Sequence, residues 1–135
     1  MQTLLIVFLF SIFYYLVFTY VDFVYQKRFV KKLISKRKNL SDKEILAFYL
    51  HSNLSESSIL ELWNEVATNF NIPSGYLRPE DCLVKMGTLK VGVDHPKVES
   101  LEEIALERQK KINKSIDLES IATLDDYIKS FADKN

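Results

Sequence analysis

The residues of this 135-residue chain that could do chemistry are few and scattered. There are two histidines, His51 and His95, and one cysteine, Cys82. The sequence has no H-x-x-x-H pair, no C-x-x-C, no G-x-S-x-G and no phosphate-binding glycine loop. A Cys82–His95 pair lacks a third group to orient it, and Asp94–His95 lacks ligand spacing toward Glu80–Asp81. We therefore expect no enzyme and no metal site.

Ser100 is a hydroxyl residue whose position in the sequence suggests a specific role. It stands before the helical pattern of "SLEEIALERQKKIN", and Glu103 follows three residues later. A serine at a helix N-cap accepts a hydrogen bond from a free backbone N–H, and a glutamate at the third position returns one. This capping box stabilises a helix by about 1 kcal/mol. The spacing predicts that Ser100 is the N-cap of a helix.

The turn at residues 78–81, Arg-Pro-Glu-Asp, is the most polar turn of the chain. Proline restricts its backbone, and a basic side chain beside two acids suggests that Arg78 pairs with a nearby carboxylate. The alternative is a docking loop, because loops on a rigid scaffold often carry contacts.

Four helical patterns are needed to position these residues. Ser41 and Glu44 predict a capping box for a helix over 41–50, and Ser55 is the expected N-cap of the next helix. Its apolar residues recur at helical spacing: Ile59, Leu62, Trp63, Val66, Ala67 and Phe70. The last two helices are expected over 100–113 and 123–135. The first has Leu101, Ile104 and Ala105 inward, with Ile112 as a further candidate, and the second has Thr123 as N-cap.

The connections between these helices are expected to be irregular. Residues 71–79 contain two prolines and a glycine and predict a turn, and 80–97 reads as a long loop. A short strand over 88–93 would have no evident partner, and 116–123 reads as a turn or a single helical turn.

The N-terminus reads as a transmembrane helix. Residues 4–21 contain no charge, glycine or proline, and 18 helical residues cover roughly 27 Å of a hydrocarbon core of about 30 Å. A cleaved signal peptide would need basic residues before the run and small residues after it, and neither is present. Nine aromatics between Phe8 and Tyr25 exceed what a tether needs, and the mid-span tyrosines would prefer hydroxyl partners.

A basic neck follows the span. It holds seven of the 18 basic residues: Lys27, Arg28, Lys31, Lys32, Lys36, Arg37 and Lys38. By the positive-inside rule the N-terminus faces outward and the rest lies in the cytoplasm. The neck is a topology signal, or alternatively a helix that binds anionic headgroups at the membrane surface.

Charge divides the chain at this neck. Residues 39–135 contain 11 basic and 17 acidic residues, a net charge of about minus six. Such a domain repels phosphate, so we expect no nucleic acid partner.

The order of elements behind the neck resembles the acyl carrier protein family over residues 57–131. The best matches are "ILELWNEVATNFNIPSGYLRPEDCLVKM" and residues 121–128, "IATLDDYI". The resemblance implies that a serine in an Asp-Ser-Leu motif carries 4'-phosphopantetheine, and the matching position is Ser100. Here Glu99 replaces the aspartate, and Arg108, Lys110 and Lys111 stand in a helix that is acidic in the family. These departures favour the cap, so we expect no cofactor.

We therefore expect an all-α protein with three parts. Residues 1–26 form a membrane anchor, 27–54 a basic neck with a connecting helix, and 55–135 a small helical bundle similar to an acyl carrier. The expected function is non-catalytic binding or tethering of an unknown cytoplasmic or membrane protein. The alternatives are a carrier modified on Ser100 and a small subunit of a membrane protein complex.

Overall fold

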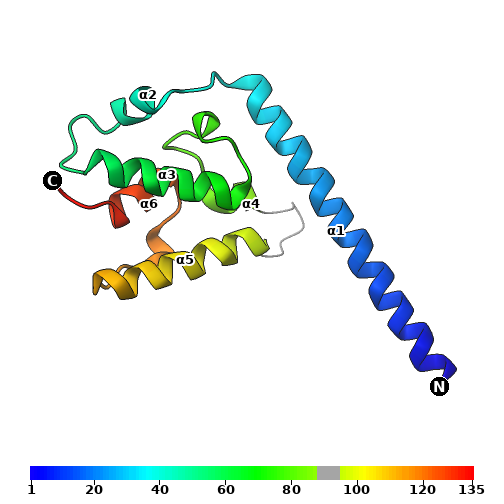
Figure 1. Ribbon diagram of the computed structural model, residues 1–135. Helices are drawn as coiled ribbons and strands as arrows, with labels where there is room; N and C mark the ends of the chain where they lie inside the picture. The colour runs from blue at the N-terminus through cyan, green and yellow to red at the C-terminus, as the bar shows by residue number, and fades with distance from the viewer. Residues whose placement is uncertain (88–94) are drawn as a thin grey trace. The chain divides into compact units, whose positions relative to one another are not determined.

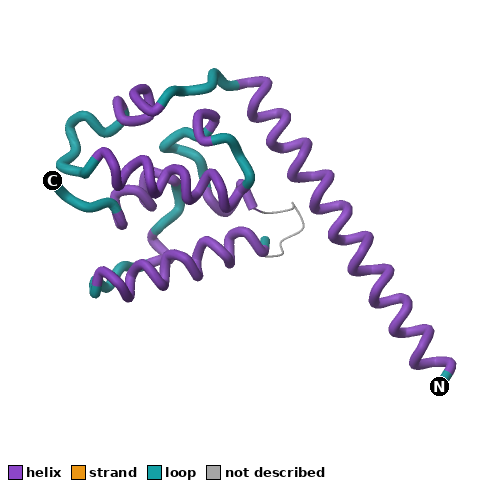
Figure 2. Tube along the Cα trace, viewed as in Figure 1, coloured by secondary structure: helices purple, strands orange, loops and turns teal. Residues whose placement is uncertain are grey.

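The computed structural model describes residues 1–87 and 95–135 (Figure 1). The short strand considered over 88–93 lies outside these residues. The chain divides into two compact units, residues 1–36 and 37–135. All regular elements among the described residues are helical, as Figure 2 shows, so the predicted all-α class is confirmed.

Helix α1 (Gln2–Lys36) forms the whole first unit. Its 35 residues form one uninterrupted helix, about 52 Å long at 1.5 Å per residue. Of the described helices, it is the one long and apolar enough to cross a membrane. The basic neck up to Lys36 continues the same helix and is not a separate element.

Helix α2 (Asp42–Ala47) opens the second unit with the predicted capping box. The Ser41 hydroxyl accepts from the backbone N–H of Glu44 at 3.4 Å, and the Glu44 carboxylate accepts from the backbone N–H of Ser41 at 2.9 Å. Lys38 donates to the same carboxylate at 2.6 Å. Hydrogen bonds from Lys38 and then Ser41 lower the pKa of Glu44 to about 2. The helix ends at Ala47, earlier than predicted.

Helix α2 and the turn after it pack against α3. Ile45 is fully buried. The ring of Phe48 stacks on Trp63 with centroids 6.5 Å apart, and Tyr49 meets the same indole edge-on. This helix therefore belongs to the bundle and does more than connect it to the neck.

Helix α3 (Glu56–Phe70) is the central element and contacts α2, α5 and α6. All six residues of its predicted apolar stripe are buried, which confirms Trp63 and Phe70 as core. Ser55 is the N-cap, as predicted, although its hydroxyl bonds the Ser57 hydroxyl and no backbone N–H. Asn71 ends the helix in the left-handed conformation, with φ 53°.

Three short elements fill the connections: η1 (Ser74–Tyr76), α4 (Leu83–Gly87) and η2 (Leu118–Ser120). The single turn predicted near residue 118 is present as η2. The expectation that residues 80–97 are entirely loop is wrong, because α4 lies within them. This helix buries Leu83 and Met86, and five residues are too few to show a helical period.

Helix α5 (Pro96–Ile112) begins four residues before the predicted start at Ser100. Leu101 and Ala105 are buried as predicted, whereas Ile104 is only half-buried and Ile112, the further candidate, is exposed. Proline at the first helical position fits because its missing N–H would have no helical partner.

Helix α6 (Leu124–Phe131) begins after Thr123 as predicted but ends at Phe131, four residues before the end of the predicted stretch. Thr123 and Asp126 form a capping box at its start. The four predicted inward residues are buried: Leu124, Tyr127, Ile128 and Phe131. Beyond α6 the chain returns to the start of α3, where the Asp133 carbonyl accepts from the Ser55 backbone N–H at 2.8 Å.

Candidate functional site

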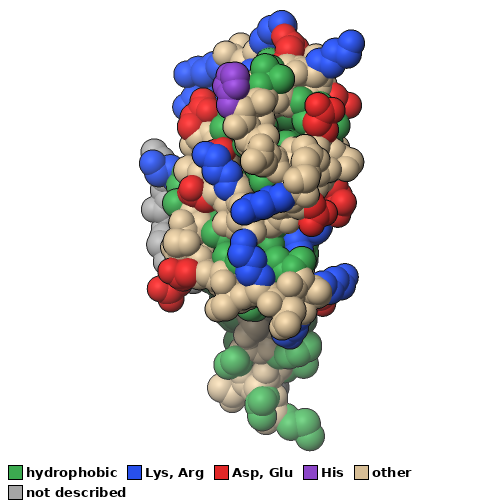
Figure 3. Space-filling model, turned by 90° about the vertical axis from the view of Figure 1, so that its left-hand side faces the viewer, with side chains coloured by type: hydrophobic (Ala, Val, Ile, Leu, Met, Phe, Trp, Pro, Cys, Tyr) green, Lys and Arg blue, Asp and Glu red, His purple; other side chains and the backbone are tan. Residues whose placement is uncertain are grey.

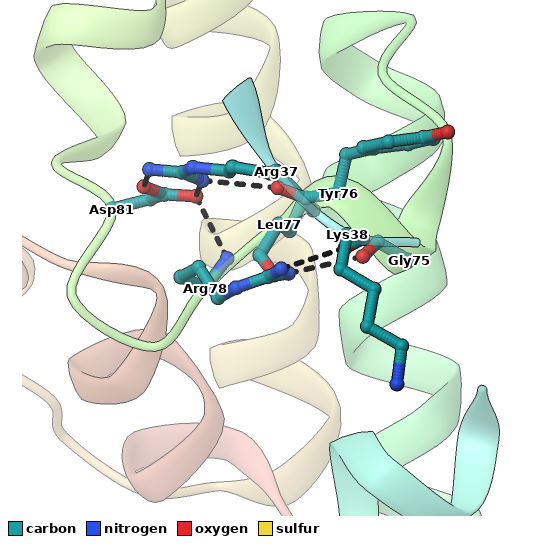
Figure 4. Close-up of polar contacts among 7 residues, drawn as sticks. All are labelled: Arg37, Lys38, Gly75, Tyr76, Leu77, Arg78 and Asp81. Atoms are coloured by element: carbon teal, nitrogen blue, oxygen red, sulfur yellow. Dashed lines mark hydrogen bonds and ion pairs between the residues drawn. The ribbon is translucent and has the colours of Figure 1, made fainter. Parts of the chain in front are cut away.

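The turn at residues 78–81 binds the segment that immediately follows α1. The Arg37 guanidinium donates two hydrogen bonds to the Asp81 carboxylate, both at 2.7 Å, and a third to the Tyr76 carbonyl at 2.9 Å (Figure 4). Asp81 is buried and also accepts from the backbone N–H of Arg78 at 2.8 Å. The hydrogen bonds that Arg37 donates to Asp81 raise the pKa of Arg37. A paired fork of this kind fixes both position and direction.

Arg78 reinforces the same junction from the other side. Its guanidinium donates to the carbonyls of Gly75 at 3.0 Å, Leu77 at 2.7 Å and Lys38 at 2.7 Å. Figure 4 shows it pointing toward Lys38 and away from Asp81. The expectation that Arg78 pairs with an acid is therefore wrong, because its side chain satisfies carbonyls and Arg37 occupies the carboxylate.

Gly75 is required for this close approach. A Cβ at this position would lie 1.9 Å from Asn39 Oδ1 and 2.5 Å from the Leu40 carbonyl oxygen. The Leu40 backbone N–H in turn donates to the Gly75 carbonyl at 2.9 Å. We call these contacts between residues 37–40 and 74–81 the junction clamp.

The neck residues fall into two groups. Five are exposed on α1: Lys27, Arg28, Lys31, Lys32 and Lys36. The Lys27 ammonium lies 5.1 Å from the ring centroid of Phe23. Arg37 and Lys38, assigned with them to the membrane surface, form ion pairs with Asp81 and Glu44 in the second unit. The sequence gives no signal for the Arg37–Asp81 pair, because 44 residues separate its members.

Ser100 is not the cap of α5, and the capping box predicted with Glu103 is wrong. The N-cap is His95, whose Nδ1 accepts from the backbone N–H of Lys97 at 3.1 Å. Ser100 lies one turn further into the helix, and its side chain is exposed. The S-x-x-E pattern indicates too late a start, because the buried His95 and Pro96 begin the helix earlier.

A small apolar cavity of about 60 Å³ lies beside Leu101, the neighbour of Ser100. Residues from α4, α5, α6, η2 and the residue after η2 line it: Leu83, Val84, Val98, Leu101, Glu102, Ala105, Leu118, Ile121 and Tyr127. It has room for a few heavy atoms and places one carboxylate, that of Glu102, at its wall.

A polar network holds the far end of α5 against α3 and α6. Arg108 donates to Glu61 at 3.1 Å and to Glu65 at 2.7 Å. Tyr127 donates its hydroxyl proton to the other oxygen of Glu65 at 2.6 Å. Burial, followed by the hydrogen bond to Glu65, raises the pKa of Tyr127 well above its usual value. This network positions α5, and with it Ser100.

Cys82 and His95 both have structural roles. Cys82 is half-buried and pairs through its backbone with Thr123 in an isolated antiparallel bridge. Asp94 lies outside the described residues. Among those that are described, no group of three or more His, Cys, Asp or Glu side chains lies close enough to hold a metal ion.

Comparison with known proteins found no relationship. No protein-family model matches the chain, and neither a curated protein nor a solved structure matches it significantly.

Proposed function

We propose that this chain is a single-pass membrane protein, N-terminus outward, whose cytoplasmic helical unit is a non-catalytic protein-binding or tethering module. The observation that supports it most directly is the continuity of α1: an apolar half long enough to span, a basic half behind it, and a folded unit that begins at Arg37. Basic residues next to a span favour the cytoplasmic side.

The junction clamp suits a short tether. Residues 4–21 fill the hydrocarbon core, and the 15 helical residues from Asp22 to Lys36 add about 22 Å beyond it. Arg37 is then bound to Asp81 within the folded unit. The folded unit follows α1 directly in the sequence, so α1 would tether the module to the membrane.

Exposed apolar side chains after α2 are the proposed contact for a protein partner. Leu50 is 73% exposed and Phe48 is 50% exposed, although Phe48 also stacks on Trp63. Aromatic and large apolar side chains dominate the binding energy of protein interfaces.

Figure 3 shows acidic and basic side chains interspersed on one face, which is typical of a soluble surface.

Topology is tested with single cysteines in a Cys82→Ser background. Lys134→Cys should react with a membrane-impermeant maleimide only after cells are permeabilised, and Thr3→Cys should react in intact cells. Labelling in the reverse order would refute the orientation, and release of the protein by alkaline carbonate would refute the anchor.

Partner binding is tested by photo-crosslinking in native membranes. A photoreactive residue at Leu50 should give one defined protein adduct, and the same residue at exposed Asp117 should not. Equal adducts at both positions would argue against this surface.

A carrier function is the second candidate, because the Ser100 hydroxyl is exposed and Leu101 beside it lines the apolar cavity. The test is the intact mass of the protein after incubation with coenzyme A and a broad-specificity phosphopantetheinyl transferase. One phosphopantetheine added to the wild type and none to Ser100→Ala would establish the carrier. No addition to protein shown to be folded would favour the tethering module.

A further inference from the structure

The polar side chains of the membrane-spanning part of α1 are gathered on one face. Between Leu4 and Asp22 the sequence has six residues that carry a hydroxyl or a charge. At about 100° per residue, five of them lie within an arc of about 140°: Ser11, Tyr14, Tyr15, Thr19 and Asp22. The exception, Tyr20, lies on the opposite side near the end of the apolar run. We call these five residues the polar stripe.

The stripe also follows the spacing of a helix-pairing seam. Ser11, Tyr15, Phe18, Asp22 and Tyr25 succeed one another at intervals of four, three, four and three residues. This is the heptad spacing that keeps one seam facing a partner helix. The opposite face is wholly apolar at mid-span, as lipid contact requires, and includes Leu9, Phe13 and Leu16.

Two hydroxyls on this face have no hydrogen-bond partner among the described residues. Tyr14 is 73% exposed and Tyr15 is 69% exposed, and both lie about half a turn past the centre of the span. The hydroxyls of Ser11 and Thr19 differ, because they donate to the carbonyls of Val7 at 2.9 Å and Tyr15 at 2.8 Å. A hydroxyl left unpaired in hydrocarbon is costly, so the tyrosines favour a polar partner at the same depth.

We infer that the polar stripe pairs α1 with a second copy of this chain as a parallel dimer within the membrane. A hydroxyl both donates and accepts, so a hydroxyl-bearing stripe is complementary to itself. Copies inserted with one topology place their stripes at the same depth, and a two-fold axis sets each residue near its equivalent. Asp22 lies at the end of the apolar run, where water and headgroups can solvate two facing carboxylates.

This inference rests on the proposed membrane anchoring, and cysteine cross-linking tests the two separately. The full chain in a Cys82→Ser background is reconstituted into phospholipid vesicles and oxidised with copper phenanthroline. Ser11→Cys and Phe18→Cys should give disulfide-linked dimers. Leu9→Cys and Leu16→Cys are controls at similar depth. Their Cα atoms would lie more than about 13 Å apart across the dimer, beyond the roughly 7 Å that a disulfide spans.

Hydroxyl removal gives a second readout. The double variant Tyr14→Phe/Tyr15→Phe should weaken the dimer about three- to thirtyfold, the range expected for an interhelical hydrogen bond in a membrane. Phe13→Leu, on the lipid-facing side, should leave it unchanged.

The possible outcomes distinguish failure of the dimer from failure of the membrane anchor. Equal cross-linking on both faces, or none at positions 11 and 18 in protein that resists carbonate extraction, overturns the dimer and leaves the anchor standing. Release by carbonate overturns the anchor itself. In native membranes, a cross-link from positions 11 and 18 to a different protein would overturn the second copy in favour of another membrane helix.

Discussion

Helices α3 and α5 have similar lengths, 15 and 17 residues, but they are held in the bundle in different ways. α3 buries seven side chains, whereas α5 buries only Leu101 and Ala105. Polar contacts hold both ends of α5. Asn69 donates to the Lys97 carbonyl at 2.7 Å, and Arg108 binds Glu65. Helix α3 is thus held by buried side chains, and α5 by a few hydrogen bonds and ion pairs near its ends.

This difference indicates which part of the second unit can move. Apolar burial is lost only when the core opens, but a helix held by a few polar contacts can detach at small cost. α5 carries Ser100 and one wall of the apolar cavity. The candidate modification site therefore lies on the least firmly packed long helix of the unit.

The largest expected effect comes from a change in the buried face of α3. Trp63→Ala removes a fully buried indole from α3 and its hydrogen bond to the Ser74 carbonyl, so we expect a loss of about 4 kcal/mol in the free energy of unfolding. Urea denaturation of residues 37–135 measures it. The matched change on α5, Leu106→Ala at a side chain 45% exposed, should stay within about 0.5 kcal/mol. Similar losses in both would contradict the contrast.

Breaking the polar hold on α5 should have an intermediate effect. Arg108→Ala leaves the Glu65 carboxylate, 21% exposed, without its cation, and we expect a cost of about 2 kcal/mol. Amide hydrogen exchange should accelerate along α5 and stay unchanged in the centre of α3. Glu61→Ala is the control and should cost little, because that side chain is 67% exposed. Uniform acceleration across the unit would mean that α5 is not an independent segment.

The capping box of α6 is expected to contribute less and to depend on pH. Thr123→Ala should cost about 1 kcal/mol at neutral pH. The hydrogen bond from the Thr123 hydroxyl lowers the pKa of Asp126 below its ordinary value of 3.8. A carboxylate whose pKa is lower in the folded state stabilises above the unfolded value, and this contribution is lost as the pH falls. The difference between wild type and Thr123→Ala should therefore shrink below about pH 4. A constant difference in acid would exclude this linkage.

Ser100 should show the smallest effect. An exposed serine inside the helix can be replaced by alanine with a change within about 0.5 kcal/mol. An N-cap at Ser100 would instead make Ser100→Ala as costly as Thr123→Ala. His95→Ala, which removes the actual cap, should cost about 1 kcal/mol. Thermal unfolding of the three variants side by side decides between the two positions of the cap.

Local patterns predicted most of the helices. The stripe of α3 and the Thr123 cap of α6 are confirmed, as is the Ser41–Glu44 box of α2. Each depends on residues within a few positions of one another. Helical period and capping geometry act over that range.

The errors have equally local causes. Helix α4 has only five residues and shows no period. Ser100 and Glu103 match a capping box, but the same pair also fits inside a helix, and it was His95 and Pro96 that set the start of α5. A short motif indicates that a residue can cap a helix, but it does not determine at which residue the helix begins.

The sequence by itself determined the apolar and basic halves of α1, the all-α class and the core face of α3, because composition and period act along the chain. Only the tertiary structure decided that Arg37 binds Asp81, that Gly75 must lack a side chain beside Asn39, and that Arg108 holds α5. These contacts join residues 36 to 44 positions apart. Many alternative pairings of the same charges are compatible with the sequence, and packing of the helices around Trp63 selects one of them.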